Sequence, residues 1–513
     1  MNQSNITVNT LALWVVLVLG LFLAVIVGAE VGAAEFSWGT ALIFLVPLLV
    51  LCVKLQARAW VLLPLGWHLS GRLPWLPLPF TVRELCFAAV IGVFLVLFAV
   101  RVVPWKRNSG LLDKLVLINL GYLVITYFRH PVGAYFLQSS MVGGRPYLEV
   151  LIATGAYFVL SRVQVSKVQA QLFPLFFVIP ALGVAFLDLL VRTLPVLGQP
   201  INYLYAGISS AQTGTSLAPA GQGVGRFIGL KDLALSGSLA LVSFFKPITL
   251  ISVMYPLRVV LFALILIVVF LTGYRSIFVS VVAFIIISSV MRRRLRDLAV
   301  FGVVGILGLS GVVALQTGGV NVPLQMQRTL SWIPLDWDSQ AVESAEGSSE
   351  WRFDMWRWAW NDASIMRDKV FGQGFGFTYD EMNIISAATM RGTPQAAFVG
   401  LSDRESYMIT GALHSGPLST IKIIGVVGLC LFFSLLIGMA AFAWRLCRKS
   451  YGTHAFTLAL FVGIPVIYEP LHFIFIFGDL TLLYPTTLFY AGLLNLASSY
   501  SKTPSGMLPV NTT

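Results

Sequence analysis

The chain has 513 residues, of which 57% are hydrophobic and only 11% are charged. Soluble domains carry about 25% charged residues, so this composition excludes a soluble enzyme. The apolar residues form long uninterrupted runs, whereas the strands of an outer-membrane barrel would alternate apolar and polar residues. The composition therefore predicts an all-α polytopic membrane protein.

The net charge of +12 and the four cysteines exclude fewer classes of protein than the hydrophobic composition does. In a soluble chain this charge would suggest nucleic acid, but here it must first be tested as a signal of membrane orientation. The cysteines show no C-x-x-C spacing, so the sequence indicates neither a disulfide framework nor a zinc site. They are Cys52, Cys86, Cys430 and Cys447.

Fourteen apolar runs are long enough, or nearly so, to cross a bilayer as helices. In chain order they cover roughly residues 11–29, 39–53, 57–69, 84–103, 112–128, 147–161, 171–192, 233–250, 256–272, 276–291, 298–316, 417–444, 453–475 and 480–498. The runs 57–69 and 233–250 are the weakest of these. The sequence thus predicts 12 to 14 transmembrane helices.

Basic residues orient these helices, because short cytoplasmic loops collect Lys and Arg. With the N-terminus inside, the cytoplasmic side holds 18 of the 34 basic residues and only two of the 22 acidic ones. Its charge is then about +16 and that of the remainder about −4. The basic excess is explained by orientation, and no nucleic-acid partner is needed.

The same alternation leaves two large segments outside, 193–232 and 317–416. We therefore expect three parts: an N-terminal bundle (1–316), a large periplasmic loop (317–416), and C-terminal helices with a short tail (417–513). Within the loop, Trp351 to Ile365 has the pattern of an amphipathic helix whose aromatic side rests on the membrane surface or on the bundle. Asp336, Asp338 and Glu343 lie in a Ser/Glu-rich stretch that we expect to be irregular and solvated, without a metal-ligand pattern.

Arg275 lies in Thr272-Gly273-Tyr274-Arg275-Ser276, at the outer turn between two predicted spans. An arginine at such a place often only anchors a helix end. It would also suit a phosphate, because a guanidinium is always charged and offers a fixed fork of donors.

His414 is followed by Ser415, nine further residues, and then Gly425 and Gly428. The glycine spacing is typical of close helix packing. The chain has only five histidines, and a histidine at the outer end of a span is either a polar cap or a general base. We interpret His414 as the base.

Other polar features are expected on the same side. Arg352 stands in Trp351-Arg352-Phe353-Asp354-Met355-Trp356, which leads to a glycine-rich turn at 371–377, and Arg357 is a rival to it. Arg226 lies in the glycine-rich stretch 221–230. This stretch is either a flexible linker or a second anion site in which Arg226 takes part. Glu469 and His472, near the outer end of a late span, either line the same cavity or join helices.

Together these motifs resemble the O-antigen ligase and polymerase superfamily, over roughly residues 220–445. The resemblance is carried by Thr-Gly-Tyr-Arg-Ser, the loop with Trp-Arg-Phe-Asp-Met-Trp and Phe-Gly-Gln-Gly-Phe-Gly, and His-Ser followed by the spaced glycines. It implies a bacterial inner-membrane protein whose active site faces the periplasm and whose donor is an undecaprenyl-diphosphate-linked glycan. It also implies an inverting, metal-independent transfer without a cofactor, with Arg275, Arg352 and His414 matching the family's two arginines and its histidine.

The chemistry of such a transfer agrees with these residue types. Arg275 and Arg352, with Arg226, Arg357, Glu469 and His472 as further substrate-binding candidates, would meet the charge of the departing diphosphate. His414 would take the proton of the acceptor hydroxyl as that oxygen attacks the anomeric carbon. A metal is not required.

The acceptor stays open between a lipid, a glycan and a protein, so ligase, polymerase and protein O-oligosaccharyltransferase are alternatives. A transporter of lipid-linked glycan is an interpretation of a different class. It predicts charged or broken helices near the bilayer midplane and internal inverted repeats, and the sequence shows neither. A scaffold with a Trp-rich docking loop leaves the coincidence of three motifs unexplained.

Overall fold

A computed structural model describes the chain with several gaps. The described residues are 46–48, 50–51, 54–74, 80–103, 110–132, 144–206, 227, 229–320, 322–363, 365–378, 407–408 and 410–502. The expected span 11–29 and most of 39–53 lie outside them. The chain divides into two compact units, Met1–Lys106 with Phe186–Leu217 and Arg107–Ala185 with Ala218–Thr513. The three parts expected from the sequence remain a prediction.

In its described residues, the smaller unit has one complete helix of spanning length, α4, among shorter elements. Its elements are η1 (Gln56–Val61), α3 (Leu62–Gly66), α4 (Val82–Ala99), the end of α8 (Leu175–Thr193), η2 (Pro195–Leu197) and α9 (Gly198–Leu204). Helix α4 begins at a capping box, in which the Glu84 N–H donates to the Thr81 hydroxyl and the Thr81 N–H donates to the Glu84 carboxylate. The weak run 57–69 is a 3₁₀ turn followed by a five-residue helix, too short to cross a bilayer.

The larger unit is the helical body that holds the candidate site. Its elements are α5 (Leu111–Arg129), α6 (Arg145–Leu160), α7 (Lys167–Leu172), the first part of α8, α11 (Leu230–Phe244), η3 (Pro247–Leu250), α12 (Pro256–Leu271), α13 (Arg275–Met291), α14 (Leu295–Thr317), α15 (Leu324–Leu330), α16 (Ser339–Asn361), α19 (Gly416–Ser450), α20 (Phe456–Phe475) and α21 (Leu480–Lys502). No strand occurs in the described part of the chain, where Arg72 forms isolated bridges with Thr81 and Ala206.

Seven of the described helices are long and apolar enough to cross a membrane, namely α4, α5, α8, α14, α19, α20 and α21. The chain is therefore an all-α polytopic membrane protein, as the composition predicts. Helices α12 and α13 are apolar but shorter, with 16 and 17 residues. The weak run 233–250 is divided between α11, whose 15 residues span about 22 Å, and the 3₁₀ turn η3, which begins at Pro247. The total of 12 to 14 spans remains a prediction.

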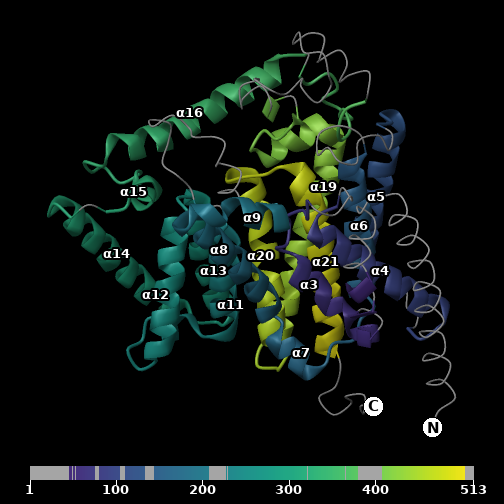
Figure 1. Cartoon of the computed structure of the whole chain (residues 1–513), viewed down its shortest axis with the longest axis horizontal. Coiled ribbons are helices and arrows are strands. Elements are labelled where there is room, and N and C mark those ends of the chain that lie inside the picture. Colours follow the sequence, from purple (N-terminus) through teal and green to yellow (C-terminus); the bar gives the residue numbers. More distant parts are fainter. Residues whose placement is uncertain are drawn as a thin grey trace. The chain divides into compact units, whose positions relative to one another are not determined.

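Helices α19, α20 and α21 pack against one another, and Figure 1 shows α16 across one end of this unit, with α7 at the other. At the end away from α16, the Arg292 guanidinium lies 5.2 Å from the Phe456 ring and that of Arg293 lies 5.6 Å from the Tyr451 ring. Arg292 and Arg293, two of the basic residues that the charge pattern assigns to the cytoplasm, thus lie at the end of this unit opposite α16.

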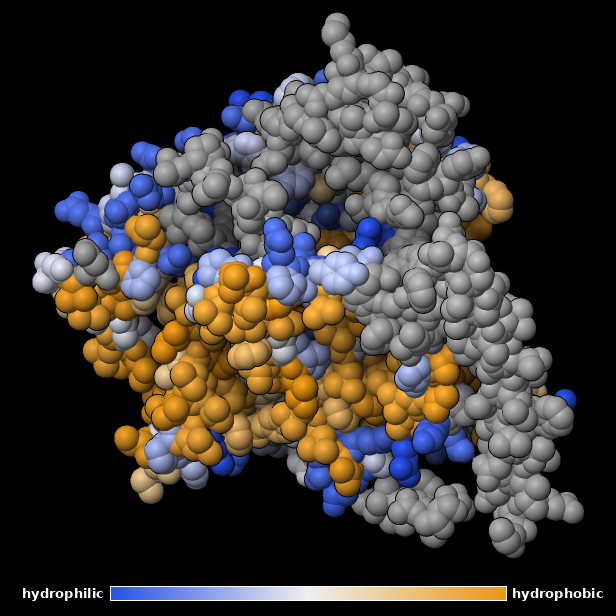
Figure 2. Space-filling view, viewed as in Figure 1, coloured by the Kyte–Doolittle hydropathy of each residue, from blue (hydrophilic) through white to orange (hydrophobic). Residues whose placement is uncertain are grey.

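The surface of the larger unit agrees with a membrane location. Figure 2 shows hydrophobic residues covering the flank formed by α12 and α14, whereas hydrophilic residues gather over α16. No residue of the apolar window of α14 is buried inside the protein. Such a helix is stable in lipid because its backbone hydrogen bonds are satisfied within the helix.

Helix α19 is broken at Gly425, where φ is 72° and ψ is 179°. Residues 369–374, which we call the inserted segment, fill the break with main-chain hydrogen bonds on both sides. The N–H groups of Gln373 and Gly374 donate to the carbonyls of Lys422 and Ile423, at 3.0 and 2.8 Å. Beyond the break, the N–H groups of Val426 and Val427 donate to the carbonyls of Lys369 and Val370, at 2.9 and 3.1 Å.

The glycines at this crossing are required by space as well as by φ. A Cβ on Gly425 would lie 2.2 Å from the Val370 carbonyl oxygen, and one on Gly372 would lie 2.4 Å from that of Ile423. The interpretation of Gly425 as a helix-packing glycine is therefore wrong, because it ends one helical segment and admits another stretch of backbone. The glycine-rich turn expected at 371–377 is observed, and its residues 372–374 pack against α19 at the break.

We expect Gly425→Ala to lower the free energy of unfolding by about 2–3 kcal/mol, because alanine is strained at this φ and its Cβ would displace the inserted segment. Thermal unfolding of the purified protein in detergent measures this. Gly308→Ala on α14 is the matched control, since nothing lies within 4 Å of a Cβ there. Equal unfolding temperatures for the two variants would contradict the role of Gly425.

Candidate functional site

Arg275 is the first residue of α13 and follows the turn at Gly273, where φ is 67°. Its Nη2 donates to the carbonyl of Ala345 in α16 at 2.8 Å. The buried Arg328 on α15 contacts the same turn and the same helix. Its Nη1 donates to the Gly273 carbonyl at 2.7 Å, and its Nη2 donates to the Ser344 carbonyl at 3.4 Å. Two guanidinium groups therefore meet neighbouring carbonyls of α16.

Helix α16 carries the second expected arginine. It begins at Ser339, with the Asp338 carboxylate accepting from the Gln340 N–H at 2.9 Å. Asp336 and Asp338 lie in irregular backbone, as expected, whereas Glu343 is helical, against the expectation. Arg352 is seven residues beyond Ala345, which places it about 10 Å further along the same face. That face is the buried one and includes Ala345 and Ala359, and the Arg352 side chain is half-buried.

His414 lies immediately before α19, with φ at 52°. Three aromatic rings surround its imidazole, with centroids at 4.6 Å for Tyr407, 5.1 Å for Phe477 and 6.0 Å for Trp351. A left-handed backbone at a residue other than glycine is uncommon, and such strain concentrates at functional sites. The rings restrict the orientation of the imidazole, and His414 is half-buried among them.

The backbone around His414 is anchored on both sides. Gly416 and Gly478 are in such close contact that a Cβ on Gly478 would lie 2.3 Å from the Gly416 Cα. The Leu413 N–H donates to the Ser419 hydroxyl at 3.1 Å, and the Leu413 carbonyl accepts from the Trp356 indole at 2.7 Å. The last of these bonds attaches the His414 segment directly to α16.

Lys422 is buried on α19, eight residues after His414. Its ammonium donates to the Met408 carbonyl, next to Tyr407. A Cβ on Gly411, where φ is 81°, would lie 3.3 Å from the Lys422 Cδ. Lys422 therefore holds the segment before His414 against α19.

The inserted segment is also held from outside α19. The Arg129 guanidinium pairs at 2.8 Å with the carboxylate of Asp368, which directly precedes the segment. The Tyr122 hydroxyl lies within hydrogen-bond distance of the carbonyls of Phe371 and Ile424, at 3.3 and 2.8 Å. The N–H groups of Phe371 and Val370 and the nearby Arg129 lower the pKa of Asp368, against the opposing effect of desolvation. The Asp368 carboxylate therefore stays charged, and keeps its ion pair with Arg129, at a lower pH than an ordinary aspartate would.

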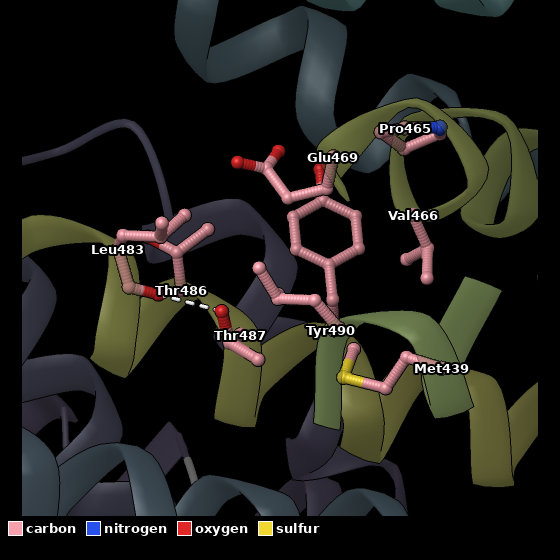
Figure 3. Close-up of a pocket in the computed structure, with 9 residues that line it drawn as sticks. Met439, Pro465, Val466, Glu469, Leu483, Thr486, Thr487 and Tyr490 are labelled. Carbon is pink, nitrogen blue, oxygen red and sulfur yellow. Dashed lines mark hydrogen bonds between the residues drawn. The ribbon is translucent and has the colours of Figure 1, made fainter. Parts of the chain in front are cut away.

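Glu469 and His472 lie on α20, with Oε1 and Nδ1 separated by 3.4 Å. Glu469, but not His472, lines a pocket of about 30 Å³ between α19, α20 and α21. Figure 3 shows the Glu469 carboxylate beside the Tyr490 ring, with Leu483 and Thr486 across from it. A pocket of this size holds about one water molecule, so it is no site for a sugar or a diphosphate as it stands.

The remaining candidates are less closely tied to this region. Arg226 lies outside the described residues. Arg357 is exposed on α16, about 140° around the helix axis from Arg352. The amphipathic helix expected at 351–365 is α16, which starts twelve residues earlier and ends at Asn361. Its buried Met355 and Ala359 pack with Met408 and Leu413, so it rests on the bundle end.

Sequence reasoning missed several residues of this region. Lys422 had a signal, because a lone lysine in the apolar run 417–444 is costly unless it has a specific role. Arg328 had a weaker one, as a basic residue in the part of the chain whose net charge is negative. Tyr407 and Phe477 had none, since each reaches His414 from a different part of the chain.

The structure thus links Arg275, Arg352 and His414 through one helix. Arg275 contacts α16 at Ala345, Arg352 belongs to α16, and His414 lies against Trp351 of α16. Fixed cations and a shielded imidazole at one end of a membrane bundle can bind an anionic group and accept a proton beside it. Within the described residues, no group of three or more His, Cys, Asp or Glu side chains is arranged to hold a metal ion.

Comparison with known proteins agrees with this arrangement. Residues 260–433 match the family model described as O-antigen ligase, and the matched range contains Arg275, Arg352 and His414. No curated protein matches the chain. The resemblance to the O-antigen ligase superfamily, a family of membrane proteins that transfer glycans, is thereby confirmed over residues 260–433.

Proposed function

We propose that the protein is an inverting, metal-independent glycosyltransferase of the bacterial inner membrane. It moves a glycan from an undecaprenyl-diphosphate donor to an acceptor hydroxyl on the periplasmic face. The acceptor is a lipid in a ligase, a growing glycan in a polymerase, or a protein in an O-oligosaccharyltransferase.

One observation carries this proposal. The match to the O-antigen ligase family contains two arginines and a histidine that α16 joins at the end of the bundle opposite the basic cluster of Arg292 and Arg293. The positive-inside rule assigns that cluster to the cytoplasm, so the site would open to the periplasm.

The two arginines would act on the diphosphate. Breaking the bond between the anomeric carbon and the diphosphate oxygen leaves the electron pair on undecaprenyl diphosphate. Guanidinium groups already in place stabilise this developing charge without reorganisation, and they are effective where water is scarce. The Ala345 carbonyl holds Arg275 in position, while the buried face of α16 directs Arg352 toward the bundle.

His414 would act on the acceptor. The acceptor oxygen attacks the anomeric carbon from the face opposite the diphosphate, and its proton passes to an imidazole nitrogen of His414. A new carbon–oxygen bond forms as the old one breaks, so one displacement inverts the configuration. The surrounding rings of Tyr407, Phe477 and Trp351 keep the imidazole aligned and limit hydrolysis by bulk water.

Among the further binding candidates, we propose Arg352 rather than Arg357 as the loop arginine, because Arg352 is half-buried on the bundle side and Arg357 is exposed. Arg226 keeps its proposed role as a supporting cation. For Glu469 and His472 we propose the alternative role of joining helices, because Glu469 lies among residues of α19, α20 and α21 and the volume beside it is small.

We expect His414→Asn to reduce the rate of transfer by about 10²- to 10⁴-fold, because it removes the base, while asparagine tolerates the left-handed backbone. The measurement is release of undecaprenyl diphosphate by purified protein in liposomes that also contain acceptor membranes. Unfolding temperature and donor binding serve as controls and should be unchanged. Full transfer by the His414→Asn or His414→Ala variant would remove His414 from the mechanism.

Arg275→Ala and Arg352→Ala should each lower transfer by about 10²- to 10³-fold, as expected for loss of a donor to developing charge. Arg357→Ala, on the same helix as Arg352, should lose at most about tenfold, because a distant exposed charge acts through screened electrostatics. The same liposome assay compares the three variants. If Arg357→Ala lost more than Arg352→Ala, the loop arginine would be Arg357.

A further inference from the structure

The outer flank of α16 carries an aromatic surface that the proposed mechanism does not use. Phe353 and Trp360 are 62% and 42% exposed, and they lie about 20° apart around the helix axis and about 10 Å apart along it. Trp356 lies between them, with its ring 5.2 Å from that of Phe353. We call these three residues the aromatic ridge.

The ridge is held in place at its middle, Trp356, and at one end, Trp360. The Trp356 indole donates to the Leu413 carbonyl, next to His414. At the Trp360 end, the Lys369 ammonium donates to the Trp360 carbonyl at 2.7 Å and lies 4.6 Å from the centre of the Trp360 ring. Lys369 belongs to the inserted segment, so the groups that position His414 also position the ridge.

Exposed aromatic side chains on a polar segment indicate a binding surface. Two occupants are conceivable, a lipid surface and a saccharide. The charged and exposed Asp354 and Arg357 lie beside the ridge, and in Figures 1 and 2 α16 lies over the bundle end in the hydrophilic part of the surface, away from the apolar flank of α12 and α14. This placement favours a saccharide, because pyranose rings offer C–H groups to aromatic faces and hydroxyls to flanking charges.

We propose that the aromatic ridge is a glycan-binding subsite that receives sugar rings next to the reaction centre. The inference rests on the proposed function, since it names the part of the protein that holds the saccharide. Trp356 is adjacent to the His414 segment, and the ridge continues from there over a length that suits more than one ring. The subsite recognises saccharide chemistry and is the same whether the chain arrives on the donor or on the acceptor.

The test measures saccharide binding separately from transfer. The probe is the oligosaccharide released by mild acid from the lipid-linked glycan of the producing cells, and its binding to full-length protein in detergent is followed by saturation-transfer NMR. The variant Phe353→Ala/Trp360→Ala should weaken binding by about tenfold or more, because two ring contacts are lost.

The control variant is Trp358→Ala, an exposed tryptophan on the opposite flank of α16, 44% exposed, whose indole contacts Asp362. It should bind the probe within about twofold of the wild type. Equal binding by the double variant and the wild type would overturn the proposal. Quenching of Trp360 fluorescence by lipids brominated along their acyl chains, absent in Trp360→Phe, would also overturn it, because the ridge would then lie in the membrane.

Transfer kinetics distinguish this proposal from the proposed function and identify the source of the saccharide. The double variant should raise KM and leave kcat nearly unchanged, for the lipid-linked donor if the ridge holds the donor chain and for the acceptor if it holds the acceptor. His414→Asn should bind the probe normally while transfer is lost. Normal transfer by His414→Asn with loss of probe binding in the double variant would contradict the proposed mechanism and leave the subsite standing.

Discussion

The pairing of residues 369–374 with both sides of the break at Gly425 is the constraint on which the rest of the site depends. An unbroken helix of 35 residues would be about 52 Å long, far more than the roughly 30 Å of a bilayer core. The break separates the first nine residues, 416–424, from the spanning part. A break in an apolar helix leaves main-chain polar groups without helical partners, and the inserted segment supplies hydrogen bonds to them.

The break also determines where the chemical groups lie. The short segment 416–424 follows His414 and contains the buried Lys422, and it is positioned by the inserted segment as well as by α20. The inserted segment is in turn attached to other helices. Asp368, which precedes it, forms an ion pair with Arg129 of α5, and Lys369 donates a hydrogen bond to the Trp360 carbonyl of α16. The inserted segment, which is neither helix nor strand, therefore joins α5, α16 and α19.

Helix α16 provides the second constraint. The guanidinium groups of Arg275 and Arg328 bind its carbonyls at residues 345 and 344, and its apolar face packs on the segment before His414. Such bonds fix the register of α16 on the bundle end. A change of one residue in that register would turn Arg352 by about 100° and move it off the bundle side.

Local and compositional features were predictable from the sequence. Long apolar runs predicted the spanning helices, and Thr-Gly-Tyr-Arg-Ser predicted the turn that places Arg275 at the start of α13. The break was not predictable, because the spacing of Gly425 and Gly428 is equally typical of helix packing, and the partner that decides the matter lies about fifty residues away. The rings around His414 were hidden for the same reason, as they come from three separate segments.

Hydrogen exchange of the amides in residues 369–374 tests this account most directly. The protein in lipid nanodiscs is exchanged into heavy water, and peptides covering 369–374 and 422–428 are followed by mass spectrometry. Because four main-chain hydrogen bonds join these stretches, the amides of Gln373, Gly374, Val426 and Val427 should exchange as slowly as those of the helices around them. Exchange of Gln373 and Gly374 at the rate of an unstructured loop would contradict the account.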